Sequence, residues 1–282
     1  MQLTGKRVVI TGAGSGLGRA FAVALAKRNC RIGVTDINLQ KAEETLNLVE
    51  KNGGRGEVMR VDVTDAGAVK TMSEHFWESW GGVDLLINNA GVISVGHVAD
   101  IPLENWQWQY EVNFWGVVYG CHYFIPMMKK QKSGHILNVA SSFGFLSFFE
   151  IAPYNSTKAA VLSLSETLKT ELAPAGIGVT ALCPMFFATN LLESLRYTDE
   201  FQKEFAHVGF KSTRMGADGV AEAGLRAVEK NKLYCVPHFF GRLYWRLKRL
   251  QPELFYAVIA WLNCRKWGKD FMLWMDRKGL LH

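Results

Sequence analysis

The stretch Thr11-Gly12-Ala13-Gly14-Ser15-Gly16-Leu17-Gly18 follows the short apolar run 7–10 and precedes an amphipathic segment over residues 19–27. Glycines at this spacing allow a tight turn, and they let bare backbone approach a pyrophosphate at the start of a helix. Free N–H groups and the helix dipole attract anions there. The turn in isolation could be a flexible loop, so its context decides. The residues that we expect at the pyrophosphate are Gly12, Ser15, Gly16, Leu17 and Gly18.

Strand-like and helix-like segments alternate along most of the chain. The pattern predicts buried strands over residues 7–10, 31–35, 57–61, 83–88, 135–139 and 178–183. It predicts longer amphipathic helices over residues 19–27, 39–52, 66–80, 106–129 and 154–172. Strands that alternate with helices indicate an α/β fold, a doubly wound parallel sheet of the Rossmann type with helices on both faces.

Asp36 stands at the end of the second predicted strand, about 20 residues after the glycine turn, where a carboxylate accepts hydrogen bonds from the ribose hydroxyls of adenosine. The same charge would repel a 2′-phosphate, and the neighbouring Ile37 supplies no compensating base. The residues therefore favour NAD over NADP as the cofactor. Asp36 could also cap the following helix, and that role is compatible with the ribose contact.

Tyr154 and Lys158 lie four residues apart at the start of a predicted helix, so their side chains share one face. An ammonium group beside a phenol stabilises the phenolate and lowers its pKa from about 10 toward the working range. A general base for an alcohol proton, or a general acid for a ketone oxygen, needs that adjustment. The same spacing is also common on solvated helix faces, so the pair alone does not establish a site.

The sequence closely resembles the short-chain dehydrogenase/reductase family over nearly all of residues 3–230. The motifs that carry the resemblance occur in the family's order. They are the turn 11–18, Asp62-Val63, Asn88-Asn89-Ala90-Gly91, Asn113, Ser141 and Tyr154-Asn155-Ser156-Thr157-Lys158. The resemblance implies an NAD-dependent oxidoreductase that transfers a hydride between nicotinamide and an alcohol or a ketone.

The resemblance also implies a role for each motif residue. Tyr154 would be the acid/base, and Lys158 would lower its pKa and hold the nicotinamide ribose. Ser141 would hydrogen-bond the substrate oxygen, and Asn113 would anchor a water molecule in a proton relay. Further cofactor contacts are implied for Asp62 and Val63 at the adenine, and along the cleft for Asn89, Ala90 and Gly91.

Two adjacent serines, Ser141 and Ser142, compete for the catalytic position. In the family the serine falls three residues after the strand asparagine, here Asn138, and thirteen before the tyrosine, here Tyr154. Both spacings select Ser141. Another familiar reading takes the second serine of such a pair as catalytic. We expect Ser141 to be catalytic and Ser142 to lie near the substrate.

The chain departs from the family pattern after the strand 178–183. The family commonly has Pro-Gly there, with a threonine five residues after the proline, whereas this chain has Pro184-Met185 and Thr189. Loss of the glycine restricts the backbone. We still expect Pro184 and Thr189 to contact the nicotinamide end of the cofactor.

Aromatic residues border the expected substrate cleft on two sides. Phe143 and Phe149 lie between the serine and tyrosine motifs, and Phe186 and Phe187 begin a variable loop that runs to about Thr213. Apolar walls with few polar groups suit a hydrophobic substrate, such as a steroid, a retinoid or a long-chain lipid-like alcohol. The same side chains could instead pack in the core or at a subunit interface.

Residues 231–282 depart from the family core of residues 1–230 and form a basic, aromatic-rich extension. From Lys230 onward eleven Lys or Arg face three acids, a net charge of +8, whereas the whole chain carries +6. Leu243, Leu247 and Leu250 share one face of a predicted helix, with Arg242, Arg246 and Arg249 elsewhere on it. We expect this extension to pack on the domain, on a partner subunit or on a membrane surface.

The remaining composition narrows the class of protein. Five scattered cysteines and seven histidines show no metal-ligand or redox spacing, so we expect no metal site. We expect a cytoplasmic protein, with its extension as the part that could attach it to a membrane. No nucleic-acid motif accompanies the basic charge. The resemblance implies a homo-oligomer. A catalytically silent nucleotide-binding protein or a peripheral membrane scaffold is the alternative, but the intact catalytic set favours an enzyme.

Overall fold

The computed structural model describes residues 1–187, 189–211, 215–265, 267, 270–271, 274–275 and 278. Within these residues one parallel sheet has the strand order β3-β2-β1-β4-β5-β6-β7. Every neighbouring pair in it is parallel. The strands are β1 (Arg7–Thr11), β2 (Arg31–Asp36), β3 (Arg55–Arg60), β4 (Leu85–Asn88), β5 (Gly134–Val139), β6 (Ile177–Leu182) and β7 (Tyr234–Cys235).

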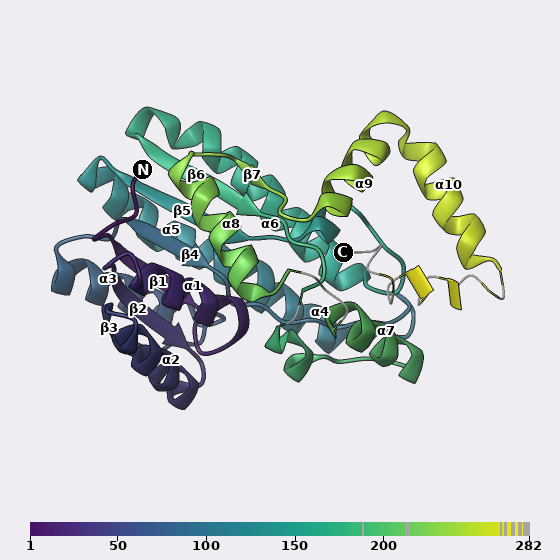
Figure 1. Ribbon diagram of the computed structural model, residues 1–282, viewed down its shortest axis with the longest axis horizontal. Coiled ribbons are helices and arrows are strands. Elements are labelled where there is room, and N and C mark those ends of the chain that lie inside the picture. The colour runs from purple at the N-terminus through teal and green to yellow at the C-terminus, as the bar shows by residue number, and fades with distance from the viewer. Residues whose placement is uncertain are drawn as a thin grey trace.

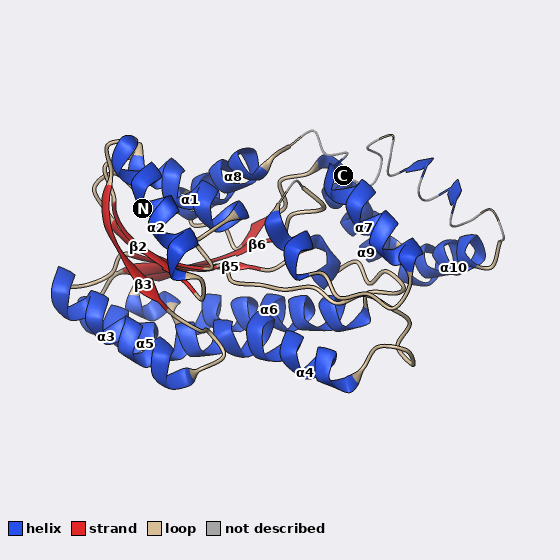
Figure 2. Ribbon diagram, turned by 90° about the horizontal axis from the view of Figure 1, so that it is seen from below, coloured by secondary structure: helices blue, strands red, loops and turns tan. Residues whose placement is uncertain are grey.

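Helices cover both faces of the sheet, which confirms the doubly wound Rossmann fold (Figure 2). One layer holds α1 (Gly16–Ala26), α2 (Leu39–Lys51) and α8 (Ala217–Glu229). The other holds α3 (Ala66–Trp80), α4 (Leu103–Tyr110), α5 (Gly116–Gln131) and α6 (Ala152–Glu171). Each layer buries its own apolar core against the sheet. The strands β1, β4 and β6 are almost entirely buried because each face of the sheet is covered.

A single turn of π-helix, Glu111–Trp115, joins α4 to α5 and contains Asn113. The helix predicted over residues 106–129 is therefore two α-helices joined through a π turn. Such turns insert one extra residue per turn and often mark functional sites, because they re-aim a side chain without ending the helix.

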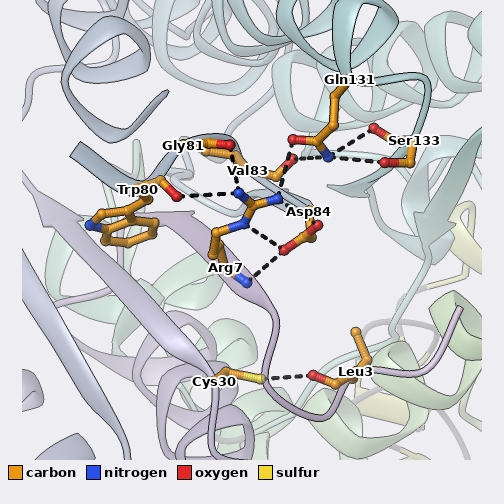
Figure 3. A network of polar contacts seen from close by, with 9 residues as sticks. All are labelled: Leu3, Arg7, Cys30, Trp80, Gly81, Val83, Asp84, Gln131 and Ser133. Carbon is orange, nitrogen blue, oxygen red and sulfur yellow. Dashed lines mark hydrogen bonds and ion pairs between the residues drawn. The ribbon is translucent and has the colours of Figure 1, made fainter. Parts of the chain in front are cut away.

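A polar network closes the amino-terminal edge of the sheet (Figure 3). Arg7, at the start of β1, donates from Nε to Asp84 Oδ2 at 2.9 Å and from Nη2 to Asp84 Oδ1 at 3.0 Å. Its Nη1 donates to the carbonyls of Trp80 and Gly81 at the end of α3. Burial raises the pKa of Asp84, but the hydrogen bonds and charge of Arg7 outweigh burial and hold that pKa below its ordinary value. One guanidinium thus ties β1, α3 and the start of β4 together.

The sheet continues past residue 230, because β7 pairs with β6. After β7 come α9 (Phe239–Leu250) and α10 (Pro252–Asn263), which extend away from the sheet (Figure 1). The ring of Trp245 stacks on Phe145 with 4.9 Å between centroids, and Gly241 is buried, so α9 packs on the domain through one face. No residue of α10 is buried. Thr213 and residues 266, 268–269, 272–273, 276–277 and 279–282 lie outside the described residues.

Candidate active site

A cavity of about 310 Å³ lies at the carboxyl ends of β1, β4, β5 and β6. The structure brings together there residues that the sequence analysis drew from five separate segments. The expected residues that line this cavity are Gly12, Ser15, Gly16, Leu17, Asn89, Gly91, Ser141, Phe143, Tyr154, Lys158, Pro184, Phe186, Phe187 and Thr189. We call it the main cavity.

The glycine turn leaves room only for bare backbone. Gly12 has a φ of +63°, and a Cβ there would lie 2.8 Å from the Cα of Ala90. A Cβ on Gly18 would collide with the carbonyl oxygen of Gly12. Asn89 braces the turn, since its Nδ2 donates to the carbonyls of Thr11 and Gly12 at 2.9 Å each. Ala90 and Gly18 therefore shape the main cavity without lining it.

The start of α1 faces this cavity without a capping side chain. Ser15 occupies the N-cap position in extended conformation, and its hydroxyl makes no capping hydrogen bond. The first N–H groups of a helix then remain available, and the helix dipole favours an anion beside them. The turn and the uncapped helix start fit the pyrophosphate of a dinucleotide.

Asp36 lies at the carboxyl end of β2, beside the glycine turn. Its Oδ2 accepts from the N–H of Gly14 at 2.8 Å, and its Oδ1 accepts from the N–H of Asn38 at 2.9 Å. The side chain that caps α2 is Asn38, which accepts from the N–H of Lys41, so the alternative role of Asp36 as that cap is wrong. The Asp36 carboxylate therefore does not cap α2, and it lies next to the glycine turn.

Asp62 and Val63 follow β3, the next strand outward. Asp62 Oδ1 accepts from the N–H and the hydroxyl of Thr64, and Val63 packs beside Gly116. Asp36, Asp62 and Val63 all lie beyond the walls of the main cavity. The adenine contacts expected of Asp62 and Val63 stay predictions.

Tyr154, Lys158 and Ser141 converge at the main cavity. The Ser141 side chain hydrogen-bonds Tyr154, and Lys158 Nζ lies 5.6 Å from the centre of the Tyr154 ring. Lys158 Nζ donates to the carbonyl of Val139 at 2.9 Å, which anchors the ammonium at the end of β5. The helical spacing thus places both side chains on the face that was predicted.

The pKa values of this pair differ from the sequence expectation. Burial raises the pKa of Tyr154 to about 12, and the hydrogen bond with Ser141 offsets only part of that rise. Burial lowers the pKa of Lys158 to about 8. We expected the ammonium to lower the pKa of the phenol. That expectation is wrong for this arrangement, because burial dominates and the Lys158 amine is bonded to Val139 rather than to the phenol.

Asn113 is fully buried in the π turn and bonds to backbone and to α6. Its Oδ1 accepts from the N–H of Val92 at 2.8 Å, and its Nδ2 donates to the carbonyl of Val92 at 2.9 Å and to Thr157 Oγ1 at 3.3 Å. The side chain therefore fixes the segment after Gly91 against the helix that bears Tyr154. Its role in a proton relay stays a prediction.

Ser142 does not reach the substrate side of the site. Its hydroxyl is fully buried and donates to the carbonyl of Cys183 at 2.9 Å. A Cβ on Gly241 of α9 would lie 3.0 Å from the same hydroxyl. The expectation that Ser142 lies near the substrate is corrected accordingly, because residues 142–144 form a 3-10 turn that points Ser142 toward β6 and α9.

A narrow second cavity of about 50 Å³ adjoins Tyr154 on the side away from the glycine turn. Phe143 connects the two, with its ring 6.4 Å from the Tyr154 ring and 5.0 Å from that of Phe186. Phe149 lines this cavity, as expected for the substrate wall. We call it the aromatic cavity. Its other aromatic walls are Phe148, Phe201 and Tyr244.

Sequence reasoning missed two contributions of the extension to the site. Tyr244 of α9 lines the aromatic cavity, and His238 Nδ1 accepts from the N–H of Met185 at 3.1 Å. Met185 occupies the place of the family's glycine and lines both cavities. No motif marks Tyr244 or His238. The sequence offered one indication, which is that Pro184-Met185 replaces the family's Pro-Gly. A changed backbone at this position suggests that another residue supports it.

The described residues include no group of three or more His, Cys, Asp or Glu placed to hold a metal ion. The five cysteines are free thiols.

Comparisons with known proteins agree with this geometry. The short chain dehydrogenase family model matches residues 6–200. The chain is 34% identical over 235 residues to the probable oxidoreductase EphD of Mycobacterium tuberculosis, an alignment that covers 80% of this chain and 40% of that protein. It thus spans well under half of that relative's length. An uncharacterized oxidoreductase of Staphylococcus aureus is 32% identical over 202 residues, with 72% of this chain and 87% of that protein covered.

A solved structure supports the same assignment. A short-chain dehydrogenase/reductase from Burkholderia phymatum, determined in complex with NAD, is 32% identical and superimposes with a TM-score of 0.85. The alignment covers 90% of this chain and 96% of that one. From the family match, the sheet order and the residues gathered at its carboxyl edge, we conclude that this chain belongs to the short-chain dehydrogenase/reductase family of oxidoreductases.

Proposed function

We propose that this protein is an NAD-dependent oxidoreductase that interconverts a hydrophobic alcohol and its ketone, with Tyr154 as the acid/base. The observation that carries the proposal is the position of Tyr154, which lines both the main cavity and the aromatic cavity. A cofactor that extends from the glycine turn and an apolar substrate in the aromatic cavity would meet at its hydroxyl. The walls of the aromatic cavity are mostly apolar, with Glu150 and Gln202 as the polar members beside Tyr154, and such walls favour a lipid-like alcohol over a sugar.

The residues at the end of β2 support NAD rather than NADP. The Asp36 carboxylate stands where the adenosine ribose would lie, and its charge opposes a 2′-phosphate. Lys41 packs beside Gly14 and could have balanced that charge, but its ammonium pairs with Glu193 at 2.6 Å. A bound NAD would supply a hydride acceptor for the carbinol carbon, and a bound NADH would supply a hydride donor for the carbonyl carbon.

The pKa values define what the chain's own groups do with the proton. A Tyr154 pKa of about 12 keeps the phenol protonated at neutral pH, ready to donate to a ketone oxygen. Ser141 beside it can donate a second hydrogen bond to that oxygen. The phenolate that remains lies near Lys158, whose Nζ is 5.6 Å from the centre of the Tyr154 ring. In the oxidation direction Tyr154 first releases its own proton to solvent, and the alcohol proton then moves to the phenolate oxygen.

An NAD-linked absorbance assay with hydrophobic secondary alcohols and ketones tests the function. Tyr154→Phe should lower kcat by about 10²- to 10⁴-fold, because a positioned acid/base contributes that much. The same variant should bind NAD as tightly as the wild type in a direct titration, and both should bind NADP more weakly. Tyr123→Phe, a change of the same kind on α5, is the control. Wild-type turnover by Tyr154→Phe would overturn the assignment of Tyr154.

We also propose that the extension docks on an anionic membrane surface. Leu243, Leu247 and Leu250 recur on the side of α9 that faces away from the domain, and Leu250 is 74% exposed. The bases Arg246 and Arg249 are exposed on an adjacent side. Apolar and basic stripes along one helix are typical of a helix that lies in a membrane interface. Among the described residues, no helix is both long and apolar enough to cross a bilayer.

We also propose a homo-oligomer whose expected contact is the two long central helices, α5 and α6. Trp115, which directly precedes α5, is 46% exposed, and its ring lies 5.9 Å from Phe114 and 5.7 Å from Tyr119. Clustered surface aromatics of this kind are enriched at interfaces between proteins.

A further inference from the structure

A third apolar hollow, of about 480 Å³, lies between α9 and α10. Its walls include Leu247 and Leu250 from α9 and Leu254, Val258 and Leu262 from α10. We call it the hairpin groove. Leu254 is 61% exposed and Val258 49% exposed. A helix whose residues are apolar nearly all round is normally buried, so α10 needs a further apolar contact.

The hairpin groove adjoins the substrate side of the active site. Phe148 and Tyr244 line both the groove and the aromatic cavity, so they form the junction between them. From this junction a row of aromatic rings leads inward. The Phe148 ring lies 6.0 Å from that of Phe143, and the Phe143 ring lies 6.4 Å from that of Tyr154.

We propose that the hairpin groove binds the aliphatic chain of the substrate. The oxygen-bearing carbon of the substrate lies at Tyr154, and its chain passes between Phe148 and Tyr244 to rest along Leu247, Leu254 and Val258. This inference rests on the proposed oxidoreductase function and narrows its substrate class. The substrate is a secondary alcohol or ketone with a long flexible chain, rather than a rigid fused-ring compound.

The width of the path selects the flexible chain. The aromatic cavity holds only about 50 Å³, which is a narrow passage between two wide hollows. A methylene chain is thin enough to pass through it with small side-chain adjustments. A fused-ring system would have to displace Phe148 and Tyr244, and displacing packed aromatic rings costs stability.

The positive charge of the extension favours a lipid surface, rather than a second copy of the chain, as the partner of α9 and α10. Two extensions packed against each other would bring a net charge of +7 against another +7. Like charges at an interface oppose association, whereas an anionic bilayer attracts the same bases. An extension docked on such a bilayer would place the hairpin groove beside lipids that enter it directly.

A series of 2-alkanols of increasing length tests the path. Each buried methylene contributes about 0.8 kcal/mol, so kcat/KM should rise about fourfold per carbon while the chain has apolar walls to cover. In the wild type this rise should continue well beyond the length that the aromatic cavity can hold. Val258→Arg should stop the rise at that length and leave kcat/KM for the short alcohols unchanged.

Ala260→Arg is the matched control. Ala260 is exposed on the same helix and does not line the groove, so an added arginine there should leave the whole series unchanged. A plateau in the wild type at the length of the aromatic cavity would overturn the proposal. So would equal behaviour of the two arginine variants. In both cases turnover of the short alcohols would still support the oxidoreductase function.

A different result would show that the proposed oxidoreductase function is wrong. If no alcohol or ketone of the series reacts, calorimetric binding of a long-chain 2-ketone to the NAD-saturated protein decides on the groove. Binding that Val258→Arg abolishes and Ala260→Arg preserves supports the groove as a lipid site. Binding that neither variant changes, or no binding at all, overturns it.

Discussion

The two edges of the sheet use polar side chains in opposite ways. At the amino-terminal edge, Arg7 and Asp84 satisfy each other and the backbone around them (Figure 3). At the carboxyl-terminal edge, Tyr154 and Lys158 are bonded on one side only and face a cavity on the other. At the amino-terminal edge the charged side chains hold structural elements together. At the carboxyl-terminal edge Tyr154 and Lys158 remain available to a ligand, and burial without a charged partner shifts their pKa values.

The difference teaches that a charged group at a strand end is not by itself a sign of function. The pKa of Arg7 is raised and that of Asp84 is lowered, yet every partner in their network is another part of the fold. What distinguishes Tyr154 and Lys158 is the adjoining space. Perturbed pKa values beside a cavity indicate a site, and perturbed values without one indicate structure.

The largest expected effect separates the two adjacent serines at the carboxyl edge. Ser141→Ala should lower kcat by about 10²- to 10³-fold, the loss typical of one hydrogen-bond donor to a reacting oxygen. Ser142→Ala should leave kcat within a few-fold, because its hydroxyl serves the carbonyl of Cys183. Steady-state assays of both variants check this. The reverse order would show that the spacing from Asn138 and Tyr154 selects the wrong serine.

A substitution at the amino-terminal edge should change the stability of the fold instead of the activity. Asp84→Asn should lower the free energy of unfolding by about 3 kcal/mol, the lower end for breaking a buried pair, because both side chains keep some exposure. Urea denaturation at neutral pH measures it, and kcat of the folded variant should equal that of the wild type. A large loss of kcat without loss of stability would contradict the division between the edges.

The same pair predicts a pH dependence of stability. Asp84 has a folded-state pKa below the value of 3.8 expected in the unfolded chain. Its contribution is therefore complete above that value and is lost as the pH falls through the folded-state pKa. The stability difference between wild type and Asp84→Asn should shrink in that acidic window.

The smallest expected effect is on membrane binding, and it is tested by comparing exposed bases on α9 with exposed bases at the amino-terminal edge. Neutralising Arg246 and Arg249 to glutamine should weaken co-sedimentation with phosphatidylserine vesicles by about 2 kcal/mol at low salt, roughly 1 kcal/mol for each base. Neutralising Lys51 and Arg55, exposed at the amino edge, should change nothing. The difference should shrink in a salt series, since the Debye length falls to about 8 Å at physiological ionic strength. Equal behaviour of the two double variants would remove the extension from membrane docking.

Most of the fold could be predicted because its signals are local. The alternation of buried strands and amphipathic helices placed each predicted element within three residues of its observed bounds. The helix over residues 66–80 is reproduced to the residue. The π turn at Asn113 could not be predicted, since no composition marks one extra residue in a helical turn. The two-residue strand β7 carries too short a pattern to stand out.

The candidate site divides in the same way. Gly12, Ser141, Tyr154 and Lys158 were predicted because the chemistry of each role demands a particular residue in a particular spacing. Tyr244 was not, because it reaches the aromatic cavity only through the packing of α9, about ninety residues along the chain from Tyr154. The pKa of Tyr154 was predicted in the wrong direction, since the sequence shows its charged neighbour but not the extent of its burial.

The hydrogen bond from the Met185 N–H to His238 has a consequence for protein engineering. A chain shortened at residue 230 would lose β7 and His238 together, and with them the support of the segment that lines both cavities. Such a truncation would report on a damaged cofactor wall rather than on the extension alone.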